Sequence, residues 1–274
     1  MVEILMSTYN GVRWMDEQIE SIVNQTYADW RLAVRDDGSS DDTIGRLREW
    51  QTRLGNKMTI IEGRNVGVIK SFEQLLLQCT SEYCMLCDQD DFWKPEKVEM
   101  TMNEMHTIEI QKPDMPAMVF TSVDLVDGNL KPLGKTFFQQ NHFDFPFAMS
   151  FRNICVCNCV AGCTMMLNER ARKLVVPFSA NAPMHDWWIA ALVAKNGIVS
   201  VVEYPTMLYR QHGDNVCGSK QKEKGYYGKL AKSPTTIFSK YREVSGFLRD
   251  VGFSGGFVAW LFFKLRHVIH RRCA

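Results

Sequence analysis

The chain has 274 residues, of which 46% are hydrophobic and 23% charged, a composition that fits a folded globular protein and excludes a disordered, collagen-like or coiled-coil one. This length allows one large domain, or one domain with an appendage. Lys and Arg number 32 and Asp and Glu 31, and this near-neutral balance argues against a dedicated nucleic-acid-binding protein.

The predicted elements alternate along the first 110 residues. Apolar runs bounded by turn residues predict strands at 2–6, 30–34, 58–61 and 83–87, and helical patterns predict helices at 14–25, 41–54, 69–78 and 95–108. This alternation is typical of βαβ units that form a parallel sheet. The rhythm changes after residue 115, where strand-like runs at 118–126, 160–167 and 198–202 and a helix from His185 predict a mixed sheet.

Each of the first four predicted strands ends in a polar cluster: Ser7-Thr8-Tyr9-Asn10, Asp36-Asp37-Gly38-Ser39, Gly63-Arg64-Asn65-Val66-Gly67 and Asp88-Gln89-Asp90-Asp91. Ligands of parallel α/β sheets bind beyond the carboxyl ends of the strands, so the four clusters are expected to converge on one crevice. Turn formation and helix capping are the alternative explanation, but they do not account for all four clusters together.

The pair Asp88 and Asp90 is the most informative of these groups. Two carboxylates two residues apart at a strand end can both reach one Mg²⁺ or Mn²⁺ and the phosphate oxygens beside it, whereas the alternative is a solvated turn. The sequence lacks G-x-G-x-x-G, and its nearest approach to a P-loop, at 213–220, has the last two residues in the wrong order. A dinucleotide dehydrogenase and a P-loop ATPase are therefore disfavoured.

Together, these motifs resemble family 2 glycosyltransferases with the GT-A fold, in particular the bacterial branch that contains rhamnosyltransferases of surface polysaccharide synthesis. The resemblance covers residues 2–215 and also rests on Gly162-Cys163-Thr164, His185-Asp186-Trp187-Trp188 and Tyr209-Arg210-Gln211-His212. It implies an α/β GT-A catalytic domain over 1–218, with a nucleotide-binding half at 1–110 and an acceptor-binding half at 111–218. Residues 219–274 would be a basic, partly helical tail.

The resemblance also implies roles for single residues. Thr8, Tyr9 and Asp37 would line a pyrimidine pocket, Asp36 would support the turn, and Arg64 and Asn65 would reach the nucleotide or its diphosphate. Asp88 would face the ribose or the metal, Asp90 would be the principal ligand of Mn²⁺ or Mg²⁺, and Asp91 would be a third carboxylate. His212 would touch the diphosphate or complete the metal site, although a single His is more often structural.

By the same resemblance, Asp186 occupies the position of the catalytic base of an inverting transferase. The alternative is an ordinary first-turn Asp, and the dipole of the predicted helix would lower its pKa, which works against a base. The implied reaction moves one sugar, rhamnose from dTDP-rhamnose or a hexose from a UDP-sugar, to a saccharide acceptor that is expected to be lipid-linked. A sugar nucleotidyltransferase and a non-catalytic nucleotide-sugar-binding protein at the membrane remain alternatives.

The charge distribution and the cysteine content predict where in the cell the protein lies. Residues 1–219 carry a net charge of −8 and residues 220–274 one of +9, and Phe257–Ile269 reads as a basic amphipathic helix. Such a helix lies in an anionic membrane interface or packs on the domain. Nine cysteines, most of them in apolar runs, are expected to be free thiols, with period-two spacing at 155, 157 and 159 suggesting a strand face rather than zinc ligands. With no signal peptide expected, the prediction is a cytoplasmic protein, peripheral at the inner membrane face.

Overall fold

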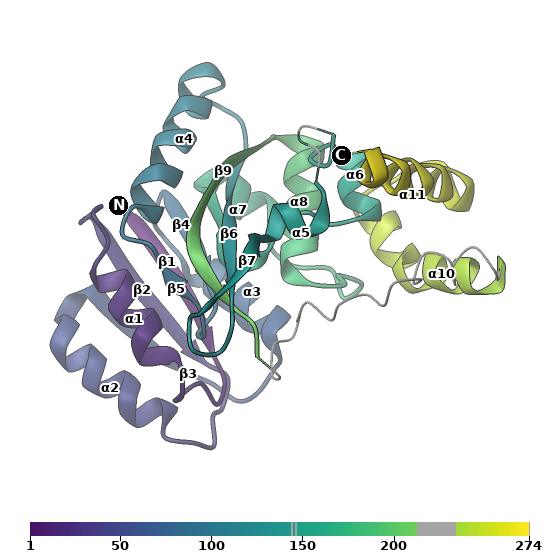
Figure 1. The fold of residues 1–274 in the computed structure, drawn as a ribbon. Helices are drawn as coiled ribbons and strands as arrows, with labels where there is room; N and C mark the ends of the chain where they lie inside the picture. Colours follow the sequence, from purple (N-terminus) through teal and green to yellow (C-terminus); the bar gives the residue numbers. More distant parts are fainter. Residues whose placement is uncertain (144, 146, 213–233, 274) are drawn as a thin grey trace.

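The computed structural model describes residues 1–143, 145, 147–212 and 234–273 (Figure 1). The P-loop-like run at 213–220 lies outside the described residues. The strands are β1 (Val2–Thr8), β2 (Trp30–Asp36), β3 (Met58–Glu62), β4 (Tyr83–Cys87), β5 (Phe92–Trp93), β6 (Ala117–Val126), β7 (Pro132–Thr136), β8 (Met165–Asn168) and β9 (Ile198–Arg210). The helices are α1 (Met15–Val23), α2 (Thr43–Leu54), α3 (Val68–Gln78), α4 (Lys97–Gln111), α5 (Phe137–Asn141), α6 (Phe151–Val156), α7 (Glu169–Val175), α8 (His185–Asn196), α10 (Pro234–Asp250) and α11 (Gly256–Cys273).

One mixed sheet organises the molecule. Its strand order is β3-β2-β1-β4-β8-β6-β9-β5, and β7 pairs with β6. The first four strands are parallel, as predicted, so their carboxyl ends meet at one edge. The sheet becomes mixed where β8 runs antiparallel to β4 and β6, while β9 is parallel to β6. The predicted change of rhythm after residue 115 is therefore confirmed.

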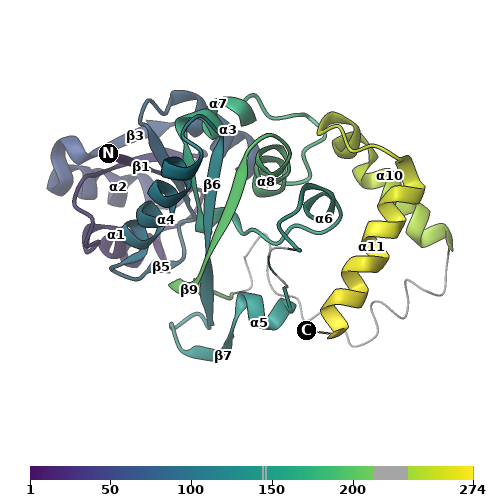
Figure 2. The same ribbon diagram turned by 90° about the horizontal axis from the view of Figure 1, so that it is seen from above.

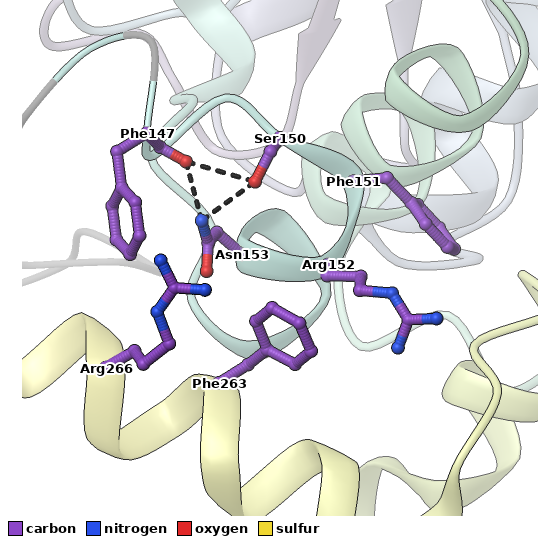
Figure 3. Close-up of a pocket in the computed structure, with 7 residues that line it drawn as sticks. All are labelled: Phe147, Ser150, Phe151, Arg152, Asn153, Phe263 and Arg266. Carbon is purple, nitrogen blue, oxygen red and sulfur yellow. Dashed lines mark hydrogen bonds between the residues drawn. The ribbon is translucent and has the colours of Figure 1, made fainter.

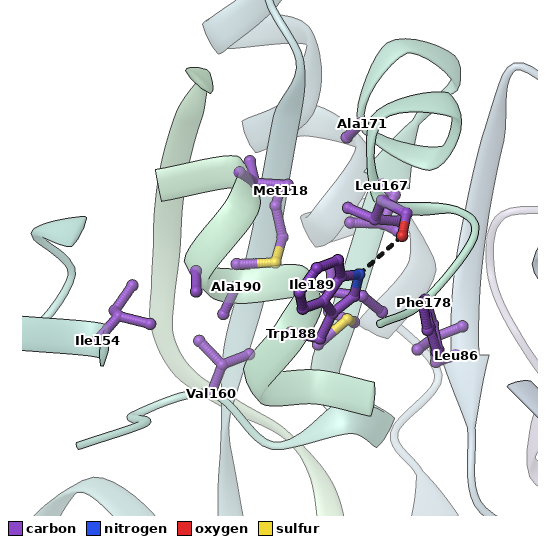
Figure 4. Close-up of a cluster of buried hydrophobic side chains, with 14 of the residues drawn as sticks. Leu86, Met118, Ile154, Val160, Leu167, Ala171, Phe178, Trp188, Ile189 and Ala190 are labelled. Carbon is purple, nitrogen blue, oxygen red and sulfur yellow. Dashed lines mark hydrogen bonds between the residues drawn. The ribbon is translucent and has the colours of Figure 1, made fainter. Parts of the chain in front are cut away.

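Helices cover both faces of the sheet (Figures 1 and 2). Alternate residues of β1 serve two cores: Leu5 packs with α3 and α8, whereas Ile4 and Met6 pack with α1 and α4. Figure 4 shows part of the first core around Trp188, whose Nε1–H donates to the carbonyl of Val175 at 2.8 Å. This alternation is the period-two signature of a strand buried on both faces.

Two predicted strands differ from the observed ones. Of residues 160–167, Gly162–Thr164 form a 3₁₀ turn and β8 begins only at Met165. The run at 198–202 continues to Arg210 as the single strand β9, whose register against β6 shifts between Thr121 and Ser122. The shift brings Pro205 opposite Ser122, and a register irregularity is where a strand tolerates a residue without an N–H.

One prediction about the cysteines is confirmed and another is wrong. Cys84 and Cys87 are buried on opposite faces of β4, and the seven cysteines from Cys79 to Cys163 are free thiols, as predicted. The strand face inferred from the spacing at 155–159 is wrong, because Cys155 lies on α6 and Cys157 follows that helix. A helix of six residues owes its stability to packing rather than to propensity, and the contacts of α6 with α8 and α11 supply it.

The C-terminal helices pack on the domain. Phe247 of α10, Val251 directly after that helix and Trp260 of α11 are buried in the same core as α6 and α8, and Figure 2 shows α11 running beside α6. The sequence predicted α11 but not α10. Among the described helices, none combines the length and hydropathy that spanning a bilayer requires.

Candidate active site

The ends of β1 and β2 form a hydrogen-bonded turn. The Thr8 hydroxyl donates to Asp36 Oδ1 at 3.2 Å, and Asp36 Oδ2 accepts from the backbone N–H groups of Gly38 (3.0 Å) and Ser39 (2.8 Å). Gly38 has a φ of +79°, and a Cβ there would lie 3.0 Å from the backbone nitrogen of Asn65. The turn therefore requires glycine, and Asp36 fixes its shape.

Asp37 joins the turn to the loop after β3. Its side chain is buried; Oδ1 accepts from the Arg35 guanidinium at 2.6 Å and from Val66 N–H at 2.8 Å, and Oδ2 accepts from Gly67 N–H at 2.8 Å. Both oxygens of Asp37 thus have donors from the protein. The side chains of Arg64 and Asn65 are exposed on the loop that Asp37 holds.

Tyr9 connects the first loop to the acidic loop, which we define as Asp88-Gln89-Asp90-Asp91. The backbone N–H of Tyr9 donates to Gln89 Oε1 at 2.9 Å, and Gln89 Nε2 donates to the Tyr9 carbonyl at 3.1 Å. The Tyr9 side chain itself is 48% exposed. The polar ends of β1, β2, β3 and β4 are therefore linked to one another, as the sequence predicted for a common crevice.

The acidic loop concentrates carboxylates in a poorly solvated place. Burial, followed by the charge of Asp90, raises the pKa of Asp88 to about 7. Asp91 is fully buried, and this burial, followed by the charges of Asp90 and Asp88, raises its pKa. Asp91 Oδ1 accepts from Arg210 N–H at 3.2 Å, but Oδ2 has no hydrogen-bond partner among the described residues. An unpartnered buried carboxylate oxygen beside a second carboxylate favours a bound cation.

The donor set fits a hard divalent cation. Ligand atoms of Asp88, Asp91 and Cys163 lie within 4.8 Å of one another. Burial raises the pKa of the Cys163 thiol, so it stays protonated and is a poor ligand for a hard cation. Asp88 and Asp91 offer carboxylate oxygens, the ligand type that Mg²⁺ and Mn²⁺ prefer. Asp90, the predicted principal ligand, is not one of the three residues of this group.

Asp90 and His212 meet at the rim of this group. His212 Nε2 lies 2.8 Å from Asp90 Oδ2, and the His212 ring stacks on Trp14 at 5.6 Å between centroids. Asp90 and His212, two of the residues predicted to serve the metal, are thus brought together although 122 positions separate them.

Arg210 is a residue at this site for which sequence reasoning gave no role. Its side chain is 1% exposed; Nε donates to the Asp90 carbonyl at 2.8 Å and one terminal nitrogen to the Gly128 carbonyl at 2.7 Å. The other terminal nitrogen pairs with Glu17, and the guanidinium lies 4.3 Å from the Trp14 ring centroid. The signal in the sequence was an arginine at the end of a strand-like segment, two residues before His212.

Asp186 is the second residue of α8 and half-buried. Burial raises its pKa to about 7, against the opposing effect of the backbone N–H groups of Trp187 and Gly162. The expectation that the helix dipole would lower this pKa is therefore wrong in its net direction, because desolvation outweighs the helix N-terminus. The Asp186 charge also contributes to the raised pKa of Asp88, which places the two carboxylates in one electrostatic site.

Comparison with known proteins identifies the family. The family model described as glycosyl transferase family 2 matches residues 3–174, and the chain belongs to this family. It is 26% identical over 246 residues to the dTDP-rhamnosyl transferase RfbG of Shigella flexneri, covering 82% of this chain and 78% of that protein. It is 24% identical to the UDP-Glc:alpha-D-GlcNAc-diphosphoundecaprenol beta-1,3-glucosyltransferase WfgD of Escherichia coli, covering 81% and 82%.

Solved structures agree on the fold. The Pyrobaculum calidifontis mannosyltransferase PcManGT, in complex with GDP-Man and Mn²⁺, aligns over 99% of this chain and 73% of its own with a TM-score of 0.61 and 14% identity. Staphylococcus aureus TarS 1-349 in complex with UDP-GlcNAc aligns over 92% and 73% with a TM-score of 0.57 and 16% identity. Against TarS 1-349 without a ligand, this chain spans 60% of the structure. The protein is thus a GT-A glycosyltransferase of family 2, as the sequence motifs implied.

Proposed function

We propose that the protein is a metal-dependent, inverting glycosyltransferase that moves one sugar from a nucleoside diphosphate sugar to a saccharide acceptor. The observation that carries the proposal is the meeting of the acidic loop with Asp186 at the edge where β1 to β4 end. The acidic loop can hold a diphosphate through a divalent cation, and Asp186 can take a proton. An inverting transfer requires both groups, on opposite sides of the reacting sugar.

In this proposal the polar loops bind the nucleotide. Thr8, Tyr9 and Asp37 belong to the pyrimidine pocket; because Asp37 has protein donors on both oxygens, it acts by holding the loop as well as by lining the pocket. Asp36 shapes the turn, and the exposed side chains of Arg64 and Asn65 reach the diphosphate. A cationic side chain and backbone N–H groups suit such an anion.

Asp88 and Asp90, with His212 beside them, would hold Mn²⁺ or Mg²⁺, and Asp91 would be the third carboxylate. When bound, the ion would neutralise negative charge on the departing diphosphate. The fit rests on the unpartnered oxygen of Asp91 and on the raised pKa of Asp88, since a cation relieves repulsion between neighbouring carboxylates.

Asp186 would act as the general base. Its carboxylate accepts the proton of the acceptor hydroxyl as that oxygen bonds to the anomeric carbon, and the electron pair of the breaking carbon–oxygen bond leaves with the nucleoside diphosphate. A pKa near 7 suits a base that works at neutral pH. This chemistry requires no covalent intermediate with the enzyme.

For the donor we favour dTDP-rhamnose, with UDP-glucose or UDP-galactose as the second candidate. The names of RfbG and WfgD support dTDP-rhamnose and UDP-glucose, and that of WfgD supports a lipid-linked saccharide acceptor in surface polysaccharide synthesis. We place the enzyme at the cytoplasmic face of the membrane, with catalytic residues in 1–218 and a basic tail in 219–274 at an anionic surface.

A donor panel tests the function. Each nucleotide sugar is incubated with the protein, Mn²⁺ and no acceptor. Slow release of nucleoside diphosphate supports transfer chemistry, and release of pyrophosphate supports a nucleotidyltransferase. Binding with no hydrolysis of any donor, and no transfer once acceptors are added, would support the non-catalytic alternative and contradict the proposal.

A further inference from the structure

A pocket away from the acidic loop lies between α6 and α11. It has a volume of about 470 Å³ and is lined by Phe147, Ser150, Phe151, Arg152, Asn153, Phe263 and Arg266 (Figure 3). Three phenylalanine rings and two guanidinium groups make its lining both apolar and cationic. We call it the α6–α11 pocket.

The two arginines have no ion pair within the part of the chain that the structure describes. Arg152 donates long hydrogen bonds to Ser254, at 3.5 Å to its carbonyl and 3.2 Å to its hydroxyl. Arg266 contacts aromatic rings, and within residues 1–212 and 234–273, as far as these are described, neither guanidinium forms an ion pair with a carboxylate. Both guanidinium groups lie near the Phe263 ring, at 5.3 and 6.0 Å from its centroid, and Figure 3 shows them on either side of that ring. Two like charges this near to one pocket favour an anion beside them.

Asn153 adds a hydrogen-bond acceptor that lacks a donor. The residue is 3% exposed, and its Nδ2 donates to the Phe147 carbonyl at 2.7 Å and to the Ser150 hydroxyl at 2.8 Å. These bonds fix the amide, and Oδ1 has no partner among the described residues. In Figure 3 this oxygen points toward the side where Arg266 and Phe263 lie. A buried acceptor in this position requires a ligand hydroxyl or a water.

Beside the pocket, α11 exposes an apolar stripe. Val258, Phe262, Leu265 and Ile269 are 77%, 55%, 55% and 61% exposed, and their spacing of four, three and four residues places them on one helix face. The Arg266 guanidinium lies 5.8 Å from the Phe262 ring centroid and so connects stripe and pocket. The opposite face of α11 packs inward through Trp260, which is 4% exposed.

We propose that the α6–α11 pocket binds the hydroxyl-bearing phosphate headgroup of a membrane lipid, with the apolar stripe of α11 resting among the lipid chains. The guanidinium groups of Arg152 and Arg266 would attract the phosphate, and Asn153 Oδ1 would accept a hydrogen bond from a headgroup hydroxyl. The apolar stripe would contact the hydrocarbon chains. This inference deepens, and rests on, the membrane association in the proposed function. A second copy of the chain packing on the stripe is the competing occupant.

Vesicle binding tests the pocket. The protein, without any donor, is mixed with phosphatidylcholine vesicles that contain phosphatidylglycerol, and the bound fraction is measured by flotation. Arg152→Gln/Arg266→Gln is expected to weaken binding about tenfold or more, since a basic residue at an anionic surface contributes about 1 kcal/mol. The control Arg48→Gln/Arg170→Gln removes the same charge from exposed ion pairs on α2 and α7, and binding should remain within twofold. Equal weakening in both variants would show diffuse attraction and overturn the pocket.

Three further measurements complete the test. Arg266→Gln alone, which removes no hydrogen bond within the described chain, should weaken binding severalfold even if the double variant folds poorly. Replacing phosphatidylglycerol with phosphatidylmethanol, an equally charged lipid without headgroup hydroxyls, should also weaken binding severalfold; no difference would contradict the role of Asn153. Sedimentation of a dimer that Phe262→Ser/Leu265→Ser dissociates would assign the stripe to a second copy. Donor hydrolysis by the wild-type protein, measured without vesicles, tests the proposed function separately.

Discussion

The environment of Asp186 suits the proposed catalytic base. Its pKa of about 7 results from burial, which the helix N-terminus only partly offsets. Asp186→Asn keeps the shape and the hydrogen-bonding size of the side chain but removes the basic group. We expect kcat to fall by about 10² to 10⁴-fold with little change in donor affinity, measured by transfer assays and by calorimetry. Full turnover by this variant would eliminate Asp186 as the base.

The pH dependence of transfer follows from the same residue. A base must be deprotonated to act, so kcat/KM for the acceptor should rise with pH and level off above an apparent pKa of about 7. The rate should then fall by about tenfold per pH unit below that value. A flat profile between pH 5 and pH 8 under conditions where the protein stays folded and metal-bound would contradict the assignment.

The buried His185, next to Asp186, should make the free energy of unfolding depend on pH. Its ring is buried and stacks on Phe72 at 4.3 Å, and burial lowers its pKa to about 3. An unfolded His takes up a proton near pH 6.5 while the folded one stays neutral, so the free energy of unfolding should fall as pH drops below 6.5, by up to about 1.4 kcal/mol per pH unit. His185→Leu should remove this part of the slope in urea titrations at pH 7, 6 and 5. Identical slopes in both proteins would contradict it.

At the scale of elements, Arg210 ties the end of β9 to the acidic loop and to α1. It bonds the Asp90 carbonyl and pairs with Glu17, and lysine cannot reproduce this forked geometry. Arg210→Lys should weaken Mn²⁺-dependent nucleotide binding about tenfold or more. Arg13→Lys, which changes the neighbouring cation over Trp14, should have less than a threefold effect. Loss of thermal stability in Arg210→Lys without loss of affinity would show a merely structural arginine.

The elements that could be predicted are those with strong local signals. Periodicity predicted β1 to β4 and the intervening helices, and the strand-end rule placed their polar clusters together. The short helix α6 and the late start of β8 could not be predicted, because packing of Cys155 and Met165 in the core, rather than local propensity, decides them. The role of Arg210 was hidden for a similar reason, since its partners lie 82 and 120 residues away in sequence.

At the scale of the whole molecule, α11 is part of the core on one face and a free apolar surface on the other. The sequence left open whether this helix packs or meets a membrane, and its two faces allow both. Trp260→Ala should lower the free energy of unfolding by about 3 kcal/mol or more, because Trp260 is buried against α10. Val258→Ala, at an exposed position of the same helix, should change it by less than about 0.5 kcal/mol. Equal effects in urea titrations would show that α11 does not pack as described.

The central claim is that the acidic loop binds a divalent cation together with the nucleotide. Calorimetric titration of UDP and dTDP into the protein, with Mn²⁺ and with EDTA, tests it most directly. The wild-type protein should bind at least one nucleotide about tenfold or more tightly with Mn²⁺, and Asp90→Asn, which keeps the size of the side chain, should abolish that difference. An undiminished gain from Mn²⁺ in Asp90→Asn, or no gain for either nucleotide in the wild-type protein, would contradict the account.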